Sequence, residues 1–330
     1  MKRLSLIIPL YNRPDEIREL LDSLLTQAEL LHEVIVVEDG SDNDAREVVD
    51  AFSGKLPTRY YVKPNSGPGQ SRNYGAERAD GDYLIFLDSD CIIPEGYLNA
   101  ILIELEQNPV DAFGGPDRAH EDFTPLQKAI NYAMTSFFTT GGIRGQAKSL
   151  DTFYPRSFNM GYSQAVFQRT KGFGPMRFGE DIDMSLRLIK EGFSTRLFPD
   201  AYVYHKRRTN FRQFFKQVFN SGMARIHLHL LHPGSLKMVH ILPAVFTVGT
   251  LGCVLLSFVN LFFLIPLIIY AMIIGLHATI TNKNLGVGML SIPAAFIQLI
   301  GYGLGFFNGV WVRLIRKKNP KGAFVKTFYD

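Results

Sequence analysis

The chain has 330 residues and a formal net charge of +4, a length that allows one large domain or two of ordinary size. From Val239 onward there are seven Lys and Arg residues and one acid, a net charge of +6, so residues 1–238 carry a net charge of −2. Because the basic excess is confined to the C-terminal part, the composition argues against a nucleic-acid partner. The two cysteines, Cys91 and Cys253, lie in segments of very different character, which indicates no disulfide framework.

The first 90 residues alternate apolar runs rich in β-forming residues with amphipathic stretches of about ten residues. The predicted strands are 4–9, 33–38, 59–63 and 83–87, and the predicted helices are 15–27, 45–52 and 70–79. This alternation is typical of βαβ units and predicts an α/β fold with a mostly parallel sheet. In such a sheet, ligands bind beyond the carboxyl ends of the strands.

Two carboxylates, Asp88 and Asp90, follow the predicted strand 83–87 directly. Asp is common at this position because it starts turns and caps helices, so an isolated D-x-D is weak evidence for a site. Two adjacent carboxylates repel each other unless a cation lies between them, and their oxygens suit Mg²⁺ or Mn²⁺. The first turn, PLYNRPDE, has no glycine, and a P-loop is also missing, so we expect a metal rather than a glycine-rich backbone to hold phosphate.

The C-terminal part contains long uncharged segments. Residues 239–280 have no Lys, Arg, Asp or Glu, and because one crossing needs about 20 apolar residues, they predict two spans that turn near Asn260. Residues 285–312 predict a third. The basic stretches HKRR (205–208) and RLIRKKNPK (313–321) are both expected on the cytoplasmic side, which requires an even number of crossings. The number of membrane crossings therefore stays open at two to four. We expect no cleavable signal at the N-terminus and expect the N-terminal domain in the cytosol.

Residues 206–237 hold seven Lys and Arg residues and no acid. Phe211, Phe214 and Val218 recur at helical spacing within this segment, which predicts an amphipathic helix in the membrane interface that binds anionic headgroups. The alternative is a helix that packs on the catalytic domain.

Four ordered motifs resemble the family 2 glycosyltransferases over residues 3–225. They are SLIIPLYNRPDEIRELLDSLLTQ, EVIVVEDGSDND, GPGQSRNYGAERADGDYLIFLDSDC and GEDIDMSLRLIKEGF. The resemblance implies a GT-A fold, a Rossmann-like mixed sheet, in a membrane-anchored bacterial enzyme of polysaccharide biosynthesis. The expected organisation is a cytosolic catalytic domain (1–205), a basic interfacial helix region (206–237), an all-α transmembrane region (238–315) and a basic cytoplasmic tail (316–330).

The resemblance also implies a donor site for a nucleotide-diphospho sugar. Asp39 corresponds to the acid that accepts a hydrogen bond from the base, a role that suits the imide N–H of uracil or the edge of guanine. Pro9 and Tyr11 are expected to wall the base, and Arg72 to lie near the nucleotide or its diphosphate. For Asp39 the alternative is an ordinary Asp-Gly turn, and for Arg72 a solvated helix residue.

The same resemblance places a Mn²⁺ or Mg²⁺ ion at Asp90, with Asp88 reaching the ribose or a metal-bound water. His205 is expected to complete the metal or diphosphate site, and an imidazole beside two carboxylates favours Mn²⁺ somewhat.

The motif GEDIDMSLRLIKEGF supplies the candidate catalytic acids. Asp181 corresponds to the base that takes the proton of the acceptor hydroxyl, Glu180 is the alternative, and Asp183 is expected to cap or position. Acids in a first helical turn also complement the helix dipole, which is the structural explanation for some of them. Asn159 is a candidate sugar contact, and the glycines of residues 139–145 predict a loop that closes over the donor.

The predicted function is transfer of one sugar, from a UDP-sugar by preference, to a lipid-linked or membrane-proximal glycan in cell-surface polysaccharide synthesis. The expected location is the inner membrane, as a multi-pass protein with its catalytic domain on the cytoplasmic face. Processive synthases of the family carry Q-x-x-R-W, whereas here VFNSG follows Gln217, which favours single addition. The alternatives are a processive synthase and a catalytically silent scaffold of a glycan-assembly complex.

Overall fold

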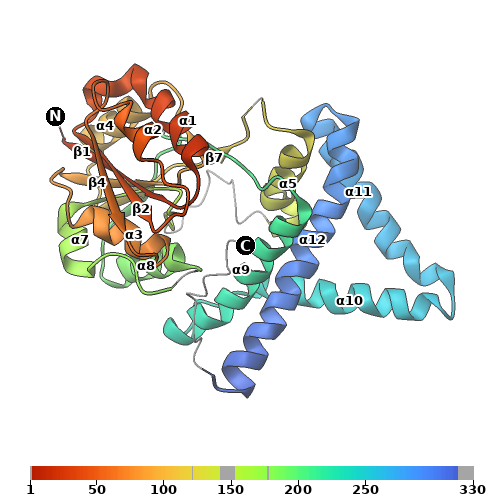
Figure 1. Ribbon diagram of the computed structural model, residues 1–330. Helices are drawn as coiled ribbons and strands as arrows, with labels where there is room; N and C mark the ends of the chain where they lie inside the picture. Colours follow the sequence, from red (N-terminus) through yellow and green to blue (C-terminus); the bar gives the residue numbers. More distant parts are fainter. Residues whose placement is uncertain (1, 121, 142–152, 177, 319–330) are drawn as a thin grey trace. The chain divides into compact units, whose positions relative to one another are not determined.

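The computed structural model describes residues 2–120, 122–141, 153–176 and 178–318 (Figure 1). The chain forms two compact units. Of the described residues, the first comprises 2–120, 153–176 and 178–206, and the second 122–141 and 207–318. The strands of the described residues all belong to the first unit, and the second is helical. Residues 122–141, expected within the catalytic domain, thus group with the C-terminal helices.

A seven-stranded sheet forms the first unit. In pairing order its strands are β3 (Thr58–Lys63), β2 (Glu33–Asp39), β1 (Leu4–Leu10), β4 (Tyr83–Leu87), β8 (Asn159–Ser163), β6 (Ala112–Gly114) and β9 (Thr195–Leu197). The first four strands are parallel, and β8 runs antiparallel to both β4 and β6. The predicted mixed sheet is confirmed, and the strand order reverses at β1, where an open sheet of this type binds its ligand.

Apolar cores cover both faces of this sheet. Alternate side chains of a strand point to opposite faces, so Leu6 and Ile8 of β1 belong to one core and Ile7 to the other. The first core is completed by α1 (Pro14–Leu24), α2 (Arg46–Asp50) and α4 (Tyr97–Gln107), and the second by α3 (Pro68–Ala76), α7 (Gln164–Thr170) and α8 (Glu180–Lys190). After α1 the chain continues as the 3₁₀ turn η1 (Leu25–Leu30), so the first predicted helix is split near its end.

A small second sheet lies beside the carboxyl end of β4. It consists of β5 (Cys91–Ile92), β10 (Val203–His205) and β7 (Asp117–Arg118). Because β10 runs antiparallel to β5 with His205 opposite Cys91, this pairing brings a histidine from late in the chain next to the Asp88-Ser89-Asp90 turn.

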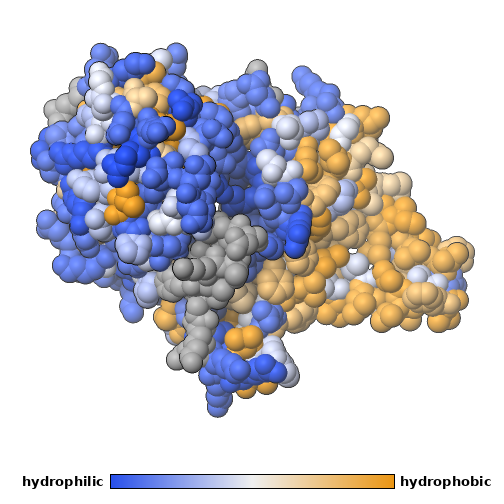
Figure 2. All heavy atoms as spheres, viewed as in Figure 1, coloured by the Kyte–Doolittle hydropathy of each residue, from blue (hydrophilic) through white to orange (hydrophobic). Residues whose placement is uncertain are grey.

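The helical unit is built around α12 (Leu285–Val310), which ends in the π-helical turn η4 (Trp311–Ile315). Its other elements are α5 (Pro125–Thr135), α6 (Phe137–Thr140), α9 (Phe211–Leu231), η2 (Met238–His240), α10 (Leu242–Ser257), η3 (Leu261–Leu264) and α11 (Ile265–Asn282). Two stretches, Leu261–Asn282 and Leu285–Ile315, are long and apolar enough to cross a membrane, and α10 is shorter. Figure 2 shows hydrophobic side chains over most of the visible surface of α10 and α11.

The phenylalanine face of α9 is partly covered within this unit. Phe214 and Val218 are buried, and they pack with Ile130 and Met134 of α5 and Ala294 of α12. This face of α9 was expected to contact lipid, but Phe214 and Val218 contact α5 and α12 instead. The sequence of α9 alone does not reveal these partner helices.

Candidate active site

The predicted donor-site residues lie at one edge of the sheet. Pro9 and Tyr11, Asp39 and Asp88 stand at the carboxyl ends of β1, β2 and β4, which are neighbours in the order β2-β1-β4. Parallel pairing with Leu10 opposite Glu38 aligns the ends of β1 and β2. Pro9 and Tyr11 are half-buried, whereas Asp39 is buried. Parallel pairing therefore brings together residues that are up to 79 positions apart in the chain.

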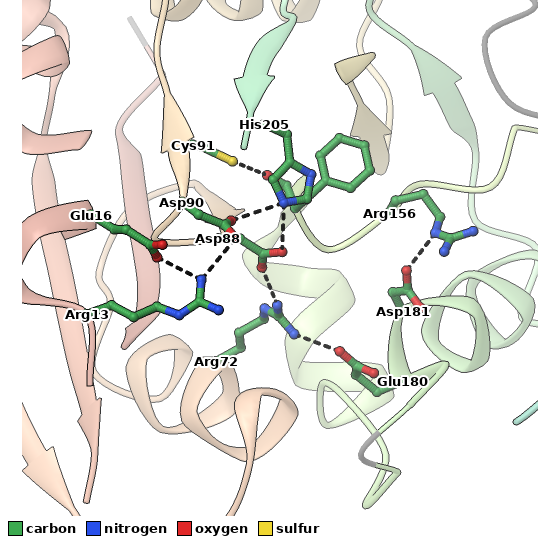
Figure 3. A network of polar contacts seen from close by, with 11 residues as sticks. Arg13, Glu16, Arg72, Asp88, Asp90, Cys91, Arg156, Glu180, Asp181 and His205 are labelled. Atoms are coloured by element: carbon green, nitrogen blue, oxygen red, sulfur yellow. Dashed lines mark hydrogen bonds and ion pairs between the residues drawn. The ribbon is translucent and has the colours of Figure 1, made fainter. Parts of the chain in front are cut away.

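Asp88, Asp90 and His205 form a compact cluster (Figure 3). Nε2 of His205 lies 3.0 Å from Oδ1 of Asp90 and 3.8 Å from Oδ2 of Asp88. Asp90 is 6% exposed, whereas the side chain of Asp88 is 31% exposed. The ring of His205 stacks on Phe158, with centroids 5.1 Å apart, which fixes the orientation of the imidazole.

This donor set fits a divalent metal. Two carboxylates and one imidazole from two separate elements converge, a set that suits Mn²⁺ and also accepts Mg²⁺. Cys91 also lies within reach, but its thiol donates a hydrogen bond to the carbonyl of Phe158 at 3.6 Å. Burial raises the pKa of Cys91 well above its ordinary value, so the thiol stays protonated and is a poor ligand. Asp88, Asp90 and His205 are therefore the residues that could hold the ion.

Arg72 joins the two acidic motifs of the chain. Its Nη2 donates to Asp88 at 2.6 Å and its Nη1 to Glu180 at 3.0 Å, from a side chain that is almost entirely buried. Burial by itself would lower the pKa of Arg72, but the charges of Asp88 and Glu180 outweigh it and the net pKa is raised. The arginine thus remains a fixed cation between the cluster of Asp88, Asp90 and His205 and the start of α8.

Glu180 and Asp181 begin α8 and have opposite electrostatic character. Oδ2 of Asp181 accepts from Nε of Arg156 at 2.6 Å, and its Oδ1 accepts from the backbone N–H of Ile182 at 2.8 Å. Burial raises the pKa of Glu180, and the adjacent Asp181 charge raises it further. For Asp181 burial also acts upward, but the ion pair with Arg156 outweighs it and the net pKa is lowered. Asp181 is therefore ionised over a wider pH range than Glu180.

Other predicted residues have clear structural contacts. The carboxylate of Asp39 accepts from the backbone N–H groups of Ser66 and Gly67 at 2.9 and 2.8 Å and pairs with Lys63, so it also fixes the loop after β3. Asp183 pairs with Arg187 one turn along α8 at 3.0 Å, in keeping with a positioning role.

Asn159 is a correction to the sequence analysis. Its Oδ1 accepts from the hydroxyl of Tyr97 and its Nδ2 donates to the carbonyl of Ala201, both at 2.7 Å, and the residue is fully buried. An amide used in this way holds β8 in the core and is not a sugar contact. Of the predicted closing loop, residues 142–145 lie outside the described part of the chain.

Two arginines of the site escaped the sequence analysis. Arg13, in the turn after β1, donates to Oδ2 of Asp90 at 3.0 Å and to Glu16 at 2.7 Å. Arg156 precedes β8 and holds Asp181. Arg13 could have been recognised from its position in the turn after β1, because that turn lies at the sheet edge where Asp90 was also expected. For Arg156 there was no local signal, because its partner is 25 residues away.

Comparison with known proteins agrees with this geometry. Residues 5–170 match the family model described as glycosyl transferase family 2. The chain belongs to this family. It is 34% identical over 194 residues to TuaG of Bacillus subtilis (strain 168), a candidate glycosyltransferase of teichuronic acid biosynthesis, covering 58% of this chain and 73% of TuaG. It is 25% identical over 252 residues to the glycosyltransferase AglE of Haloferax volcanii, covering 75% of this chain and 81% of AglE.

Some relatives are much longer than the matched region. A glycosyltransferase of Rickettsia felis is 35% identical over 137 residues, which are 42% of this chain and 22% of that protein. The chain thus spans about a fifth of the length of the Rickettsia relatives it matches.

The GT-A fold is confirmed by solved structures. The mannosyltransferase PcManGT from Pyrobaculum calidifontis, in complex with GDP-Man and Mn²⁺, superposes with a TM-score of 0.65 at 15% identity, covering 94% of this chain and 88% of that one. S. aureus TarS 1–349, in complex with UDP-GlcNAc, gives 0.50 at 16% identity, covering 98% and 95%.

Proposed function

We propose that this family 2 member is an inverting, metal-dependent glycosyltransferase that adds one sugar to a lipid-linked or membrane-proximal glycan. The observation that carries the proposal is the Arg72 bridge, because it ties Asp88 of the candidate metal site to Glu180, the neighbour of the candidate base Asp181. The donor is a nucleotide-diphospho sugar, with a UDP-sugar favoured. The names of two comparison proteins support this class: TarS is in complex with UDP-GlcNAc, and TuaG is named as a candidate glycosyltransferase of teichuronic acid biosynthesis.

The residues at the ends of β1, β2 and β4 bind the donor in this proposal. Asp39 accepts a hydrogen bond from the base, because an oxygen with one hydrogen bond keeps further acceptor capacity, and Pro9 and Tyr11 wall the base. Asp90 and His205 hold Mn²⁺ or Mg²⁺, and Asp88 completes its ligands directly or through water. When bound, the ion supplies positive charge for the diphosphate leaving group.

Asp181 acts as the general base. Its carboxylate takes the proton of the acceptor hydroxyl, whose oxygen attacks the anomeric carbon while the bond from that carbon to the diphosphate oxygen breaks on the opposite side. A lowered pKa keeps Asp181 ionised before this step, and the ion pair with Arg156 orients the carboxylate. Glu180 is the second candidate for the base. Its pKa is raised, and Arg72 ties it to the donor side.

We also propose that the second unit associates with the cytoplasmic face of the inner membrane and binds anionic lipids. Its support is the uncharged segment 239–280 between Lys237 and Lys283, together with the exposed basic residues Arg212 and Lys216 of α9. The sequence predicts a multi-pass protein, and α11 and α12 have the length that a crossing requires, whereas α10 does not.

The decisive experiment measures donor binding and turnover by the full chain in detergent. A panel of UDP- and GDP-sugars is tested with Mn²⁺, Mg²⁺ or chelator for the wild type, Asp90→Ala and Asp181→Asn, with Asp50→Asn as an exposed control on α2. We expect one donor to bind only with metal and Asp90→Ala to lose that binding. Asp181→Asn should bind the donor and turn over about 10²–10⁴-fold more slowly, the usual contribution of a positioned base.

Three outcomes would contradict parts of this assignment. If no nucleotide sugar binds under any metal condition, the carboxylates are turn residues and the chain is a scaffold. If several sugars are added in one encounter, the chain is a processive synthase. If the product keeps the anomeric configuration of the donor, single displacement with one base is wrong.

A further inference from the structure

Three helices of the second unit enclose a triangle (Figure 1). α10 meets α12 at Thr247, whose hydroxyl lies 3.5 Å from the carbonyl of Leu299 and whose side chain fills the space beside Gly303. α11 meets α12 about four turns earlier, where Gly275 and Thr279 fill the space beside Gly288. From these two contacts α10 and α11 run toward their junction at 258–264, so α12 forms the base of the triangle and this junction its apex.

The two sides of the triangle pack together where Phe246 and Tyr270 meet Phe296 of α12, and both are too short to cross a bilayer. From Thr247 to Ser257 on α10, and from Ile265 to Gly275 on α11, each leg has about eleven residues, or about 16 Å at the α-helical rise. The hydrocarbon core of a bilayer is about 30 Å thick. Each leg therefore matches one leaflet.

The apex has the composition of a segment buried in hydrocarbon. Four of its large apolar side chains, Phe258, Val259, Leu261 and Phe262, are between 74% and 85% exposed, and Phe263 is 42% exposed. Residues 239–269 contain no charged residue and no Trp or Tyr, the residues that anchor a segment at the far interface. A hairpin that crossed the bilayer would place these four side chains among far headgroups and water. The charges lie instead at the base of the hairpin, at Lys237 and Lys283.

The opposite face of α12 packs against a charged helix. Residues two apart on a helix point in nearly opposite directions, so Gly303 faces α10 while Gly301 and Gly305 face α9, next to Val218 and Phe219. α9 also carries Arg212, Lys216 and Arg225, which are exposed or half-exposed. Because cations are costly in hydrocarbon, α9, and α12 beside it, belong at the level of the headgroups.

We propose that the second unit is a monotopic membrane module in which the α10–α11 hairpin enters one leaflet and α12 lies along the membrane surface. The occupant of its apolar surface is a bilayer leaflet with anionic headgroups around Lys237 and Lys283. The inference rests on the membrane association proposed above, with the difference that the hairpin enters one leaflet and does not cross the bilayer. It also removes the conflict between three apolar segments and two basic stretches on one side, because no segment crosses.

Cysteine accessibility in sealed membrane vesicles tests the proposal. The background is the full chain with Cys253→Ser, and single cysteines are introduced as Val259→Cys at the apex and Lys283→Cys at the base. A membrane-impermeant maleimide is applied to right-side-out and inside-out vesicles, with and without detergent. We expect Lys283→Cys to react from the cytoplasmic side, and Val259→Cys to react from either side less than a tenth as much as in detergent.

Two other outcomes would overturn the insertion model, and they are distinguishable. Labelling of Val259→Cys only from the side opposite to Lys283→Cys shows that the hairpin crosses the membrane. Labelling of both from the same side without detergent shows that the hairpin is outside the bilayer, or covered by a second copy, and the proposed membrane association fails as well.

A second measurement does not depend on labelling. Val259→Glu should lower the membrane-bound fraction of the full chain at least tenfold, because the carboxylate would lie in hydrocarbon. Met238→Glu, at an apolar residue before α10 that is 74% exposed against 84% for Val259, should lower it much less. Equal small effects of the two substitutions would contradict a buried apex.

Discussion

At the scale of single residues, the candidate site consists of acidic side chains whose negative charges are paired with arginines. Arg13 pairs with Asp90, Arg72 with Asp88 and Glu180, and Arg156 with Asp181. A buried carboxylate without a partner is strongly destabilising, so acids at this density need cations held equally firmly. Each arginine comes from a different segment, which explains why the cluster is recognised only when these segments are folded together.

The opposite pKa shifts of Glu180 and Asp181 make the choice of base measurable. The base must be deprotonated, so the acidic limb of kcat/KM follows its pKa. If Asp181 is the base, we expect activity to persist well below neutral pH, because its pKa is lowered. Arg156→Gln removes the ion pair and should raise the pKa of Asp181, moving the acidic limb to higher pH. The measurement is the pH profile of kcat/KM for wild type and variant.

Glu180 as the base would give a different profile. Its raised pKa would place the wild-type limb closer to neutrality, because the carboxyl stays protonated to higher pH. Arg187→Gln is the matched control, since it removes the partner of Asp183 on the same helix and should leave the limb in place. A wild-type limb near neutrality that Arg156→Gln does not move would contradict the assignment of Asp181.

At the scale of elements, glycines determine how α12 packs. A Cβ at Gly305 would collide with the backbone carbonyl of Phe219, so α9 and α12 touch backbone to backbone at this point. Gly301 and Gly309 continue the same face of α12 at intervals of four residues. Small residues at this spacing allow helices to approach closely, the arrangement seen in small-xxx-small contacts of membrane proteins.

Gly305→Ala should destabilise the helical unit by about 1–3 kcal/mol, the cost of overpacking a close contact. Gly252→Ala in α10 is the control, because a Cβ there meets nothing within 4 Å, and helix propensity predicts a gain of at most about 1 kcal/mol. Thermal unfolding of the full chain in detergent measures both. Equal shifts in the two variants would show that the α9–α12 contact does not limit stability.

At the scale of the whole molecule, the chain combines a polar α/β unit with an apolar helical unit that carries basic residues. If α9 lies at the headgroups, Arg212→Gln with Lys216→Gln should weaken binding to anionic vesicles about thirtyfold, since each cation near an anionic surface contributes about 1 kcal/mol. Flotation with vesicles of increasing anionic lipid content measures the effect. On zwitterionic vesicles the variant and the wild type should bind equally, and a loss there would point to misfolding rather than electrostatics.

Local patterns were sufficient for much of the first unit. Buried parallel strands are apolar along their whole length, so the runs at Leu4, Glu33 and Tyr83 were recognisable without any partner. The turns after them were recognisable as well, because carboxyl ends of parallel strands share one edge. For this reason Asp39 and Asp88 were placed at the same edge from sequence alone, and the family resemblance that the motifs carry is confirmed.

The sequence by itself thus determined the α/β class, the family, and the apolar character of the C-terminal helices, because these depend on short-range periodicity and composition. The resemblance implied that His205 joins Asp90, and the structure adds the β5–β10 pairing that brings it there. Only the tertiary structure decided that Arg13 and Arg156 hold Asp90 and Asp181, and that Asn159 is a core residue. It also decided that α9 packs on α12. Such contacts join residues that are distant in the chain, and their energies depend on burial and geometry that no local pattern records.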